Sequence, residues 1–69
     1  MPLSLLGSGE TRTILRIKGR DEQRRHIESL GFVEGAEVTV ISEMAGNLIV
    51  SIKDARIAID RSLANRIIV

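Results

Sequence analysis

The absence of cysteine is the feature that most restricts how this chain can fold. A domain of 69 residues buries only about 60% of the surface that its unfolded chain exposes, so its stability is marginal. Disulfides and thiolate-bound metals, which hold many small domains together, are not open to it. Ile, Leu, Val and Ala supply nearly all of its 43% hydrophobic residues, and Phe32 is its only aromatic residue. The core must therefore come from aliphatic packing within one domain, residues 1–69.

The N-terminal residues do not form a targeting signal. Residues 1–6 lack a basic segment and are too short for the apolar core of a signal peptide. No run of about 18 apolar residues occurs, so we expect no membrane-spanning segment. We interpret the chain as a complete, small cytoplasmic protein of bacterial type.

Charge is unevenly distributed, although the formal net charge is only +1. Residues 12–25 hold six basic and two acidic residues, and residues 28–60 hold two basic and six acidic ones. Such asymmetry can steer an acidic partner toward the basic segment. The alternative is that these charges only solvate the surface.

The clearest local signal is a helix over residues 21–30 with marked ends. Asp21 has the side chain of an N-cap residue. Ile27 and Leu30 are three residues apart and share a face. Gly31 follows the last apolar residue, where a helix commonly ends on a residue with positive φ. The sequence therefore predicts that Gly31 is the C′ residue of this helix.

Alternation with a period of two predicts strands on both sides of the helix. In residues 12–18, Thr13, Leu15 and Ile17 alternate with mostly polar neighbours, as in a half-buried strand. After the helix, β-branched alternation predicts strands at 37–43, 48–53, 55–59 and 66–69, with turns at 45–47, at Asp54 and within 61–65. One turn of 3₁₀ helix is the alternative within 61–65.

Several short strands with frequent turns indicate a small barrel, which removes the exposed edges that a short chain cannot cover. The predicted fold class is mainly β, a small β-barrel of about five strands with one inserted helix at about residues 21–30.

No group of residues in the sequence indicates catalysis. His26 is the only histidine, and no nucleophile motif or orienting partner accompanies it. Glu22 and His26 are four residues apart and could share a helix face, but two ligands make a weak metal site. The Gly7-Ser8-Gly9 segment lacks the third glycine of a phosphate-binding loop. We expect no enzymatic activity, no cofactor and no specific metal site.

A surface for another protein remains. Leu3, Leu5 and Leu6 form an apolar N-terminal strip, and Met44 falls at a hairpin tip where burial is not expected. An alternative is that Leu3 and Leu6 cover the open side of the barrel. With the arginines of the basic segment, the predicted partner-binding residues are Leu3, Leu5, Leu6, Met44, Arg24 and Arg25.

The stretch from Arg24 to Val40 resembles the signature of the FeoA family, ferrous-iron transport protein A. That signature is an Arg-rich helix, Leu-Gly-Phe, two residues, Gly and a Val-x-Val strand. The opening Pro2–Leu6 and the close from Ile57 to Val69 also resemble the family, so the resemblance covers almost the whole chain. Glu34 departs from it, because the family often has Pro before this glycine.

The resemblance implies an SH3-like barrel with an inserted helix. It also implies a role in bacterial ferrous-iron uptake, assisting FeoB, the membrane transporter with a cytoplasmic G-protein domain, either by binding it or by regulating its nucleotide hydrolysis. The same barrel forms the C-terminal domain of metal-dependent repressors of the diphtheria-toxin-repressor type, where it contacts other domains.

Two alternatives stay open, a regulator-type interaction module and a nucleic-acid-binding barrel. The basic segment favours the second, whereas the small net charge and the single aromatic residue oppose it, so no nucleic acid is expected as partner. The sequence leaves the oligomeric state open.

Overall fold

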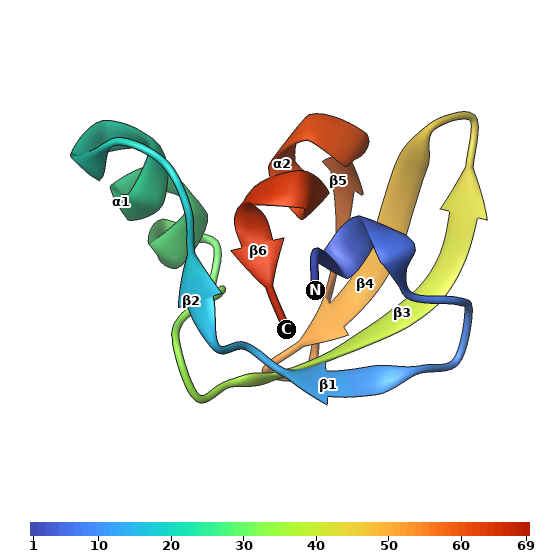
Figure 1. Ribbon diagram of the computed structural model, residues 1–69. Helices are drawn as coiled ribbons and strands as arrows, with labels where there is room; N and C mark the ends of the chain where they lie inside the picture. The colour runs from blue at the N-terminus through green and yellow to red at the C-terminus, as the bar shows by residue number, and fades with distance from the viewer.

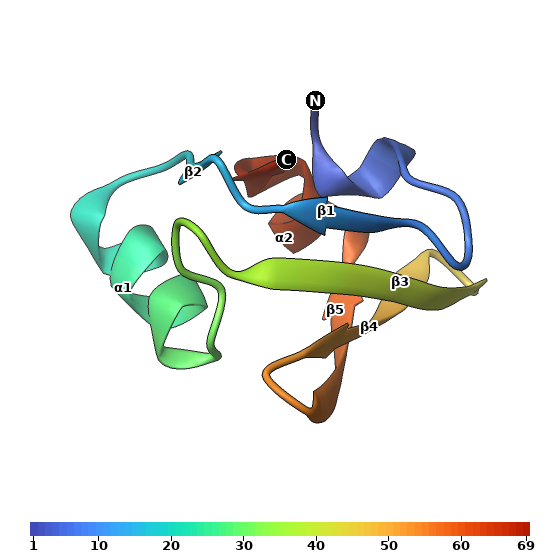
Figure 2. The same cartoon turned by 90° about the horizontal axis from the view of Figure 1, so that it is seen from below.

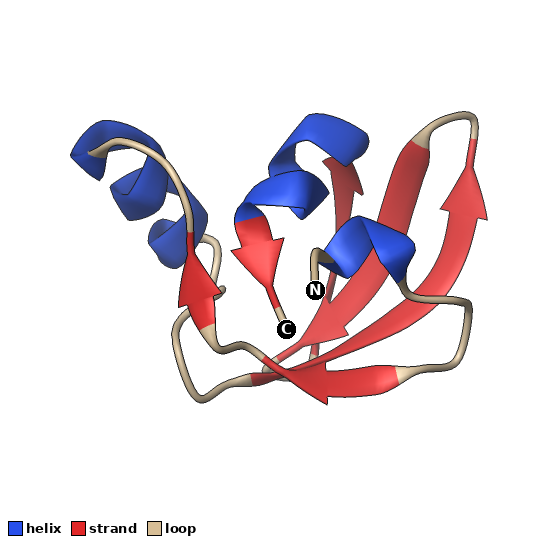
Figure 3. Ribbon diagram, viewed as in Figure 1, coloured by secondary structure: helices blue, strands red, loops and turns tan.

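A computed structural model describes residues 1–69 as two small antiparallel sheets that curl around one aliphatic core (Figure 1). The elements follow the order η1 (Leu3–Leu5), β1 (Thr11–Thr13), β2 (Arg16–Ile17), α1 (Asp21–Ser29), β3 (Glu37–Met44), β4 (Asn47–Ile52), β5 (Ala55–Asp60), α2 (Arg61–Arg66) and β6 (Ile67–Ile68). Strands outweigh helices, as Figure 3 shows, so the prediction of a mainly β fold is confirmed. The strands number six, because the expected first strand is divided into two.

The larger sheet has the order β1-β3-β4-β5. Tight turns join its last three strands: Met44 pairs with Asn47, and Ile52 pairs with Ala55. Two-residue turns of this kind match the twist of the flanking strands when both central residues have positive φ. The first turn meets this condition with Ala45 at φ +50° and Gly46 at φ +85°. The expected turn at 45–47 is thus one residue shorter, since residue 47 already belongs to β4.

The smaller sheet pairs β2 with β6, and the predicted single strand over 12–18 is wrong at its centre. The amide of Ile14 donates to the Ala36 carbonyl at 2.8 Å, whereas the next amide, that of Leu15, donates to the Ile68 carbonyl at 2.8 Å. The chain therefore crosses from one sheet to the other between these two residues. Ile14 is buried and Leu15 is exposed, the reverse of the expectation from strict alternation.

Helix α1 ends as predicted. Gly31 has φ +105°, its amide donates to the Glu28 carbonyl at 2.9 Å, and the amide of Phe32 donates to the Ile27 carbonyl at 3.4 Å. These two bonds form a Schellman motif. The start of the helix differs by one residue: the N-cap is Arg20, whose amide donates to the Gln23 side chain at 3.2 Å.

The turn expected within residues 61–65 is a short α-helix, α2. Asp60 is its N-cap, and Asp60 Oδ1 accepts a hydrogen bond from the Leu63 amide at 2.8 Å. Six residues are too few to show helical periodicity, so the sequence indicated a short turn, with one turn of 3₁₀ helix as the alternative. The helix packs against η1, as Figure 2 shows from below.

The core consists of aliphatic side chains and Phe32, and it contains no buried polar or charged residue. Leu3 and Leu6 belong to it, at 0% and 5% exposure. Their assignment to an exposed partner-binding strip is therefore wrong, because η1 turns these two side chains inward over the open side of the barrel. Leu5, between them, is 68% exposed. None of the helices is long and apolar enough to cross a membrane.

Candidate binding groove between the two helices

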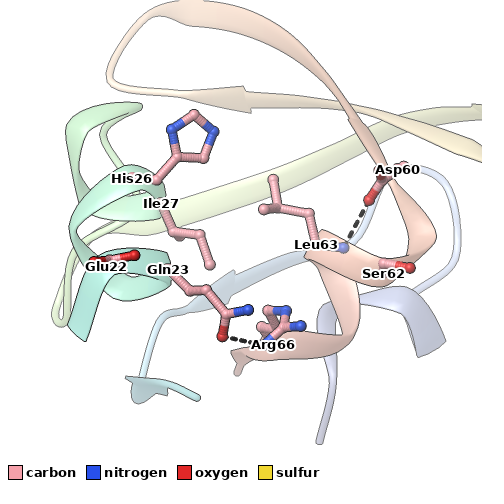
Figure 4. Close-up of a pocket in the computed structure, with 8 residues that line it drawn as sticks. All are labelled: Glu22, Gln23, His26, Ile27, Asp60, Ser62, Leu63 and Arg66. Atoms are coloured by element: carbon pink, nitrogen blue, oxygen red, sulfur yellow. Dashed lines mark hydrogen bonds between the residues drawn. The ribbon is translucent and has the colours of Figure 1, made fainter. Parts of the chain in front are cut away.

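A groove of about 370 Å³ separates α1 from α2 (Figure 4). Helix α1 supplies one wall, and the end of β5 with α2 supplies the other. Ile27 and Leu63 provide its apolar surface. The remaining lining residues are polar or charged: Glu22, Gln23, His26, Asp60, Ser62 and Arg66.

Helix α1 stands to one side of the barrel and is held at few points (Figures 1 and 2). Ile27 is its only fully buried side chain. Burying one isoleucine contributes about 1.5–3 kcal/mol. The second point is a hydrogen bond across the groove, in which the Arg66 guanidinium donates to Gln23 Oε1 at 2.7 Å. The wall is thus positioned by one apolar and one polar contact.

Gln23 reaches both partners because residue 19 is glycine. Its Oε1 accepts from the Arg20 amide and from Arg66. A Cβ at Gly19 would lie 2.8 Å from that oxygen, and the backbone there has φ +125°. A side chain at this position would displace the amide group that joins α1 to α2.

Several charged groups of the groove are free to bind a ligand. Glu22 has no hydrogen-bond or salt-bridge partner, and Asp60 uses only Oδ1, as the N-cap of α2. Arg66 is held by Gln23. The bond to the neutral Gln23 amide leaves the positive charge of Arg66 in place, so the groove holds two carboxylates, Glu22 and Asp60, against one guanidinium and is negative on balance.

The arrangement does not fit a metal centre. Glu22 and His26 both line the groove, as their spacing predicted. No group of three or more His, Cys, Asp or Glu residues is placed to hold a metal ion. Divalent metals bound by protein alone require more ligands than this pair supplies.

The predicted partner-binding residues do not meet at the groove. Leu5 lies in η1, and Met44 ends β3 at the hairpin tip, where it is 62% exposed. Arg24 lines a second depression of about 270 Å³ with Ile17, Glu28 and Glu34. Arg25 is an exposed residue of α1. The structure therefore places these four residues on separate parts of the surface.

Sequence reasoning missed the α2 side of the groove. The available signal was Asp60, an N-cap residue that precedes the apolar residues Leu63, Ala64 and Ile67, which have helical spacing. That signal predicts a helix start, but it does not reveal which helix lies opposite.

Comparison with known proteins establishes the relationships of the chain. The family model described as the FeoA domain matches residues 1–69. The chain belongs to the FeoA domain family. No curated protein matches it. The solved structures described next confirm the SH3-like barrel with an inserted helix as the fold.

Solved structures agree with this family. A crystal structure of an iron uptake regulatory protein, FeoA, is 31% identical with a TM-score of 0.90, over 97% of this chain and 91% of that one. A zinc-complexed FeoA of Stenotrophomonas maltophilia, described as an SH3 domain protein and a candidate activating factor of bacterial ferrous-iron transport, is 27% identical with a TM-score of 0.85, over 99% and 87%.

The same barrel also occurs inside longer proteins. A manganese-dependent transcriptional repressor is 26% identical with a TM-score of 0.86. The similarity covers 97% of this chain but only 39% of the repressor. The FeoA domain therefore resembles a module that other chains combine with further domains.

Proposed function

We propose that this FeoA-family protein is a non-enzymatic accessory factor of bacterial ferrous-iron uptake. It binds the cytoplasmic part of the membrane transporter FeoB and modulates its activity from the cytoplasm. Family membership over residues 1–69 carries this proposal. The description of the Stenotrophomonas maltophilia relative as a candidate activating factor supports it.

Two exposed apolar side chains support a protein partner. Leu5 is 68% exposed and Met44 is 62% exposed. Apolar side chains at the centre of an interface contribute most of its affinity. We assign Leu5 and Met44 as anchors and the exposed Arg24 and Arg25, on another part of the surface, as charges that steer the approach of the partner.

The test measures binding of the purified protein to the isolated cytoplasmic domain of FeoB. Leu5→Asp and Met44→Asp should each weaken binding by at least about tenfold, the equivalent of 1.4 kcal/mol. Leu15→Asp is the matched control, because Leu15 is 62% exposed and lies outside the proposed surface. GTP hydrolysis by the FeoB domain, measured with and without the protein, separates activation from binding alone.

Two outcomes would contradict the proposal. If the wild-type protein does not bind the FeoB domain, the proposed function is contradicted. If the folded Leu5→Asp and Met44→Asp variants bind as well as Leu15→Asp does, the assignment of Leu5 and Met44 as anchors is contradicted, whereas the proposed function is not.

A further inference from the structure

Strand β5 forms an open edge of the larger sheet. It pairs only with β4, from Asn47↔Asp60 to Ile52↔Ala55. In a hairpin with a two-residue turn, the pair next to the turn is hydrogen-bonded and the pairs then alternate. The backbone groups of Arg56 and Ala58 therefore point away from β4. Their amides make no other backbone hydrogen bond.

This edge is exposed to solvent and carries little protection. Arg56 and Ala58 are both exposed, and Ile57 between them is only partly buried. An open edge with apolar residues pairs readily with another extended chain unless charges or a covering element prevent it. Here the strand has a single charged residue before its last position.

The edge leads into the groove between α1 and α2. Asp60 ends β5 and lines the groove, opposite Glu22 and His26 of α1. Figure 4 shows this placement, with Asp60 on the α2 side of the groove and Glu22 and His26 on α1. A single extended segment can add to an open strand edge, as in PDZ and PTB domains, which bind peptides by strand addition. A second copy of this chain, pairing through its own β5, would instead protect the same amides without any probe as the protein concentration rises.

The chemistry of the groove specifies the segment further. Every second side chain of an added strand faces the same side. One such side chain would lie over Ile27 and Leu63, which requires an apolar residue. A neighbouring one on the same side would face the uncommitted carboxylates of Glu22 and Asp60, which favours Lys or Arg.

We infer that the open edge of β5 and the groove between α1 and α2 together bind an extended peptide segment by strand addition, with an apolar and a basic side chain facing the groove. The inference deepens the proposed function, on which it rests for the source of the segment, a cytoplasmic stretch of FeoB. It gives the protein a second contact, separate from the anchors Leu5 and Met44.

The test uses hydrogen–deuterium exchange and binding measurements on the full chain. The probes are the FeoB cytoplasmic domain, overlapping peptides from FeoB's cytoplasmic segments, and a synthetic peptide with Val and Lys in turn at every second position and Thr between them, so that Val and Lys share one side. We expect a bound probe to slow exchange at the amides of Arg56 and Ala58, which are otherwise unprotected. Ala58→Pro, which removes the outward amide without removing a bond to β4, should weaken binding at least tenfold.

A charge reversal provides a variant that leaves the strand intact. Glu22→Lys should weaken binding of the basic probes, whereas Glu28→Lys, the same change on the same helix but outside the groove, should bind like wild type. The wild-type exchange measurement decides the matter even where Ala58→Pro does not fold.

The outcomes separate this inference from the proposed function. FeoB binding with no added protection at Arg56 and Ala58 overturns the strand addition and keeps the accessory role. Protection by the Val-Lys peptide without any binding of FeoB or its peptides keeps the groove and overturns the accessory role. No protection by any probe, and no FeoB binding, overturns both.

Discussion

Gly31 ends α1 with φ +105°, in a region that side chains rarely adopt. An added Cβ would lie 3.8 Å from Ile52 Cγ2, an ordinary contact, so the cost of a side chain here comes from the backbone. We expect Gly31→Val to lower the free energy of unfolding by about 1–3 kcal/mol, because a β-branched residue in this conformation is strained. Urea or thermal unfolding measures the change.

Gly7 provides the control for this substitution. It is exposed, its φ is not among the positive values, and an added Cβ would meet only the end of the flexible, exposed Glu10 side chain, at 3.2 Å. Gly7→Val should therefore unfold close to wild type. Equal stability of the two variants would contradict the role assigned to the helix end.

The sequence predicted Gly31 correctly because a helix stop is a local signal. The prediction of one continuous strand through Ile14 and Leu15 was wrong for a non-local reason. Their amides donate to segments of two different sheets, so the alternation of buried and exposed side chains fails between them. Leu3 and Leu6 were misplaced for a related reason. Whether a leucine near a terminus is covered depends on which element lies beneath it, and η1 packs against α2 from the other end of the chain.

In the β3–β4 hairpin, the backbone conformation of Ala45 in the turn affects the stability of the protein. Ala45 adopts φ +50° in this turn, a conformation that costs an L-residue other than glycine roughly 1–2 kcal/mol. Ala45→Gly relieves this cost but adds about 0.4–1 kcal/mol of unfolded-chain entropy. We expect a net stabilisation of about 0.5–1 kcal/mol, measured as a shift of the urea midpoint at unchanged slope.

Ala55→Gly is the matched comparison. Ala55 is also exposed, but it lies in β5 without positive φ. Glycine in a strand destabilises by roughly 0.5–1 kcal/mol. Opposite signs at the two alanines are expected, and destabilisation at both would show that the turn is not strained.

Local sequence patterns predict individual helices and strands, but they do not predict which elements lie opposite each other across the groove. The signature over Arg24–Val40 indicated the family, and α1 and the hairpin strands were predicted near their observed bounds. The two walls of the groove, however, come from residues 22–27 and 60–66, which no spacing along the chain relates. Their approach depends on Ile27 entering a core that strands from both ends of the chain complete.

For the whole molecule, we predict no tight binding of ferrous iron to the isolated protein. Glu22 and His26 provide two ligands, too few for a closed protein site. Anaerobic titration should show no stoichiometric, submicromolar binding. Tight binding that His26→Ala abolishes would contradict this prediction.

A second prediction at this scale concerns the basic segment. Arg24 belongs to a segment with an excess of positive charge, and charges outside the centre of an interface act mainly on the association rate. Arg24→Ala should slow association with the FeoB domain and reduce its salt dependence, with little change in dissociation. Lys53→Ala, outside this segment, is the control, and equal effects of both would argue against steering by residues 12–25.

The crossing between Ile14 and Leu15 links the registers of the two sheets. One covalent bond joins a residue that fixes β1 against the segment before β3 to a residue that fixes β2 against β6. A slip of one residue in the pairing of β1 would therefore force the same slip in the pairing of β2 and expose the opposite set of side chains. In separate hairpins, the pairing registers of β1 and β2 would form independently. Here they are coupled, so a register error in β1 cannot persist unless β2 makes the same error.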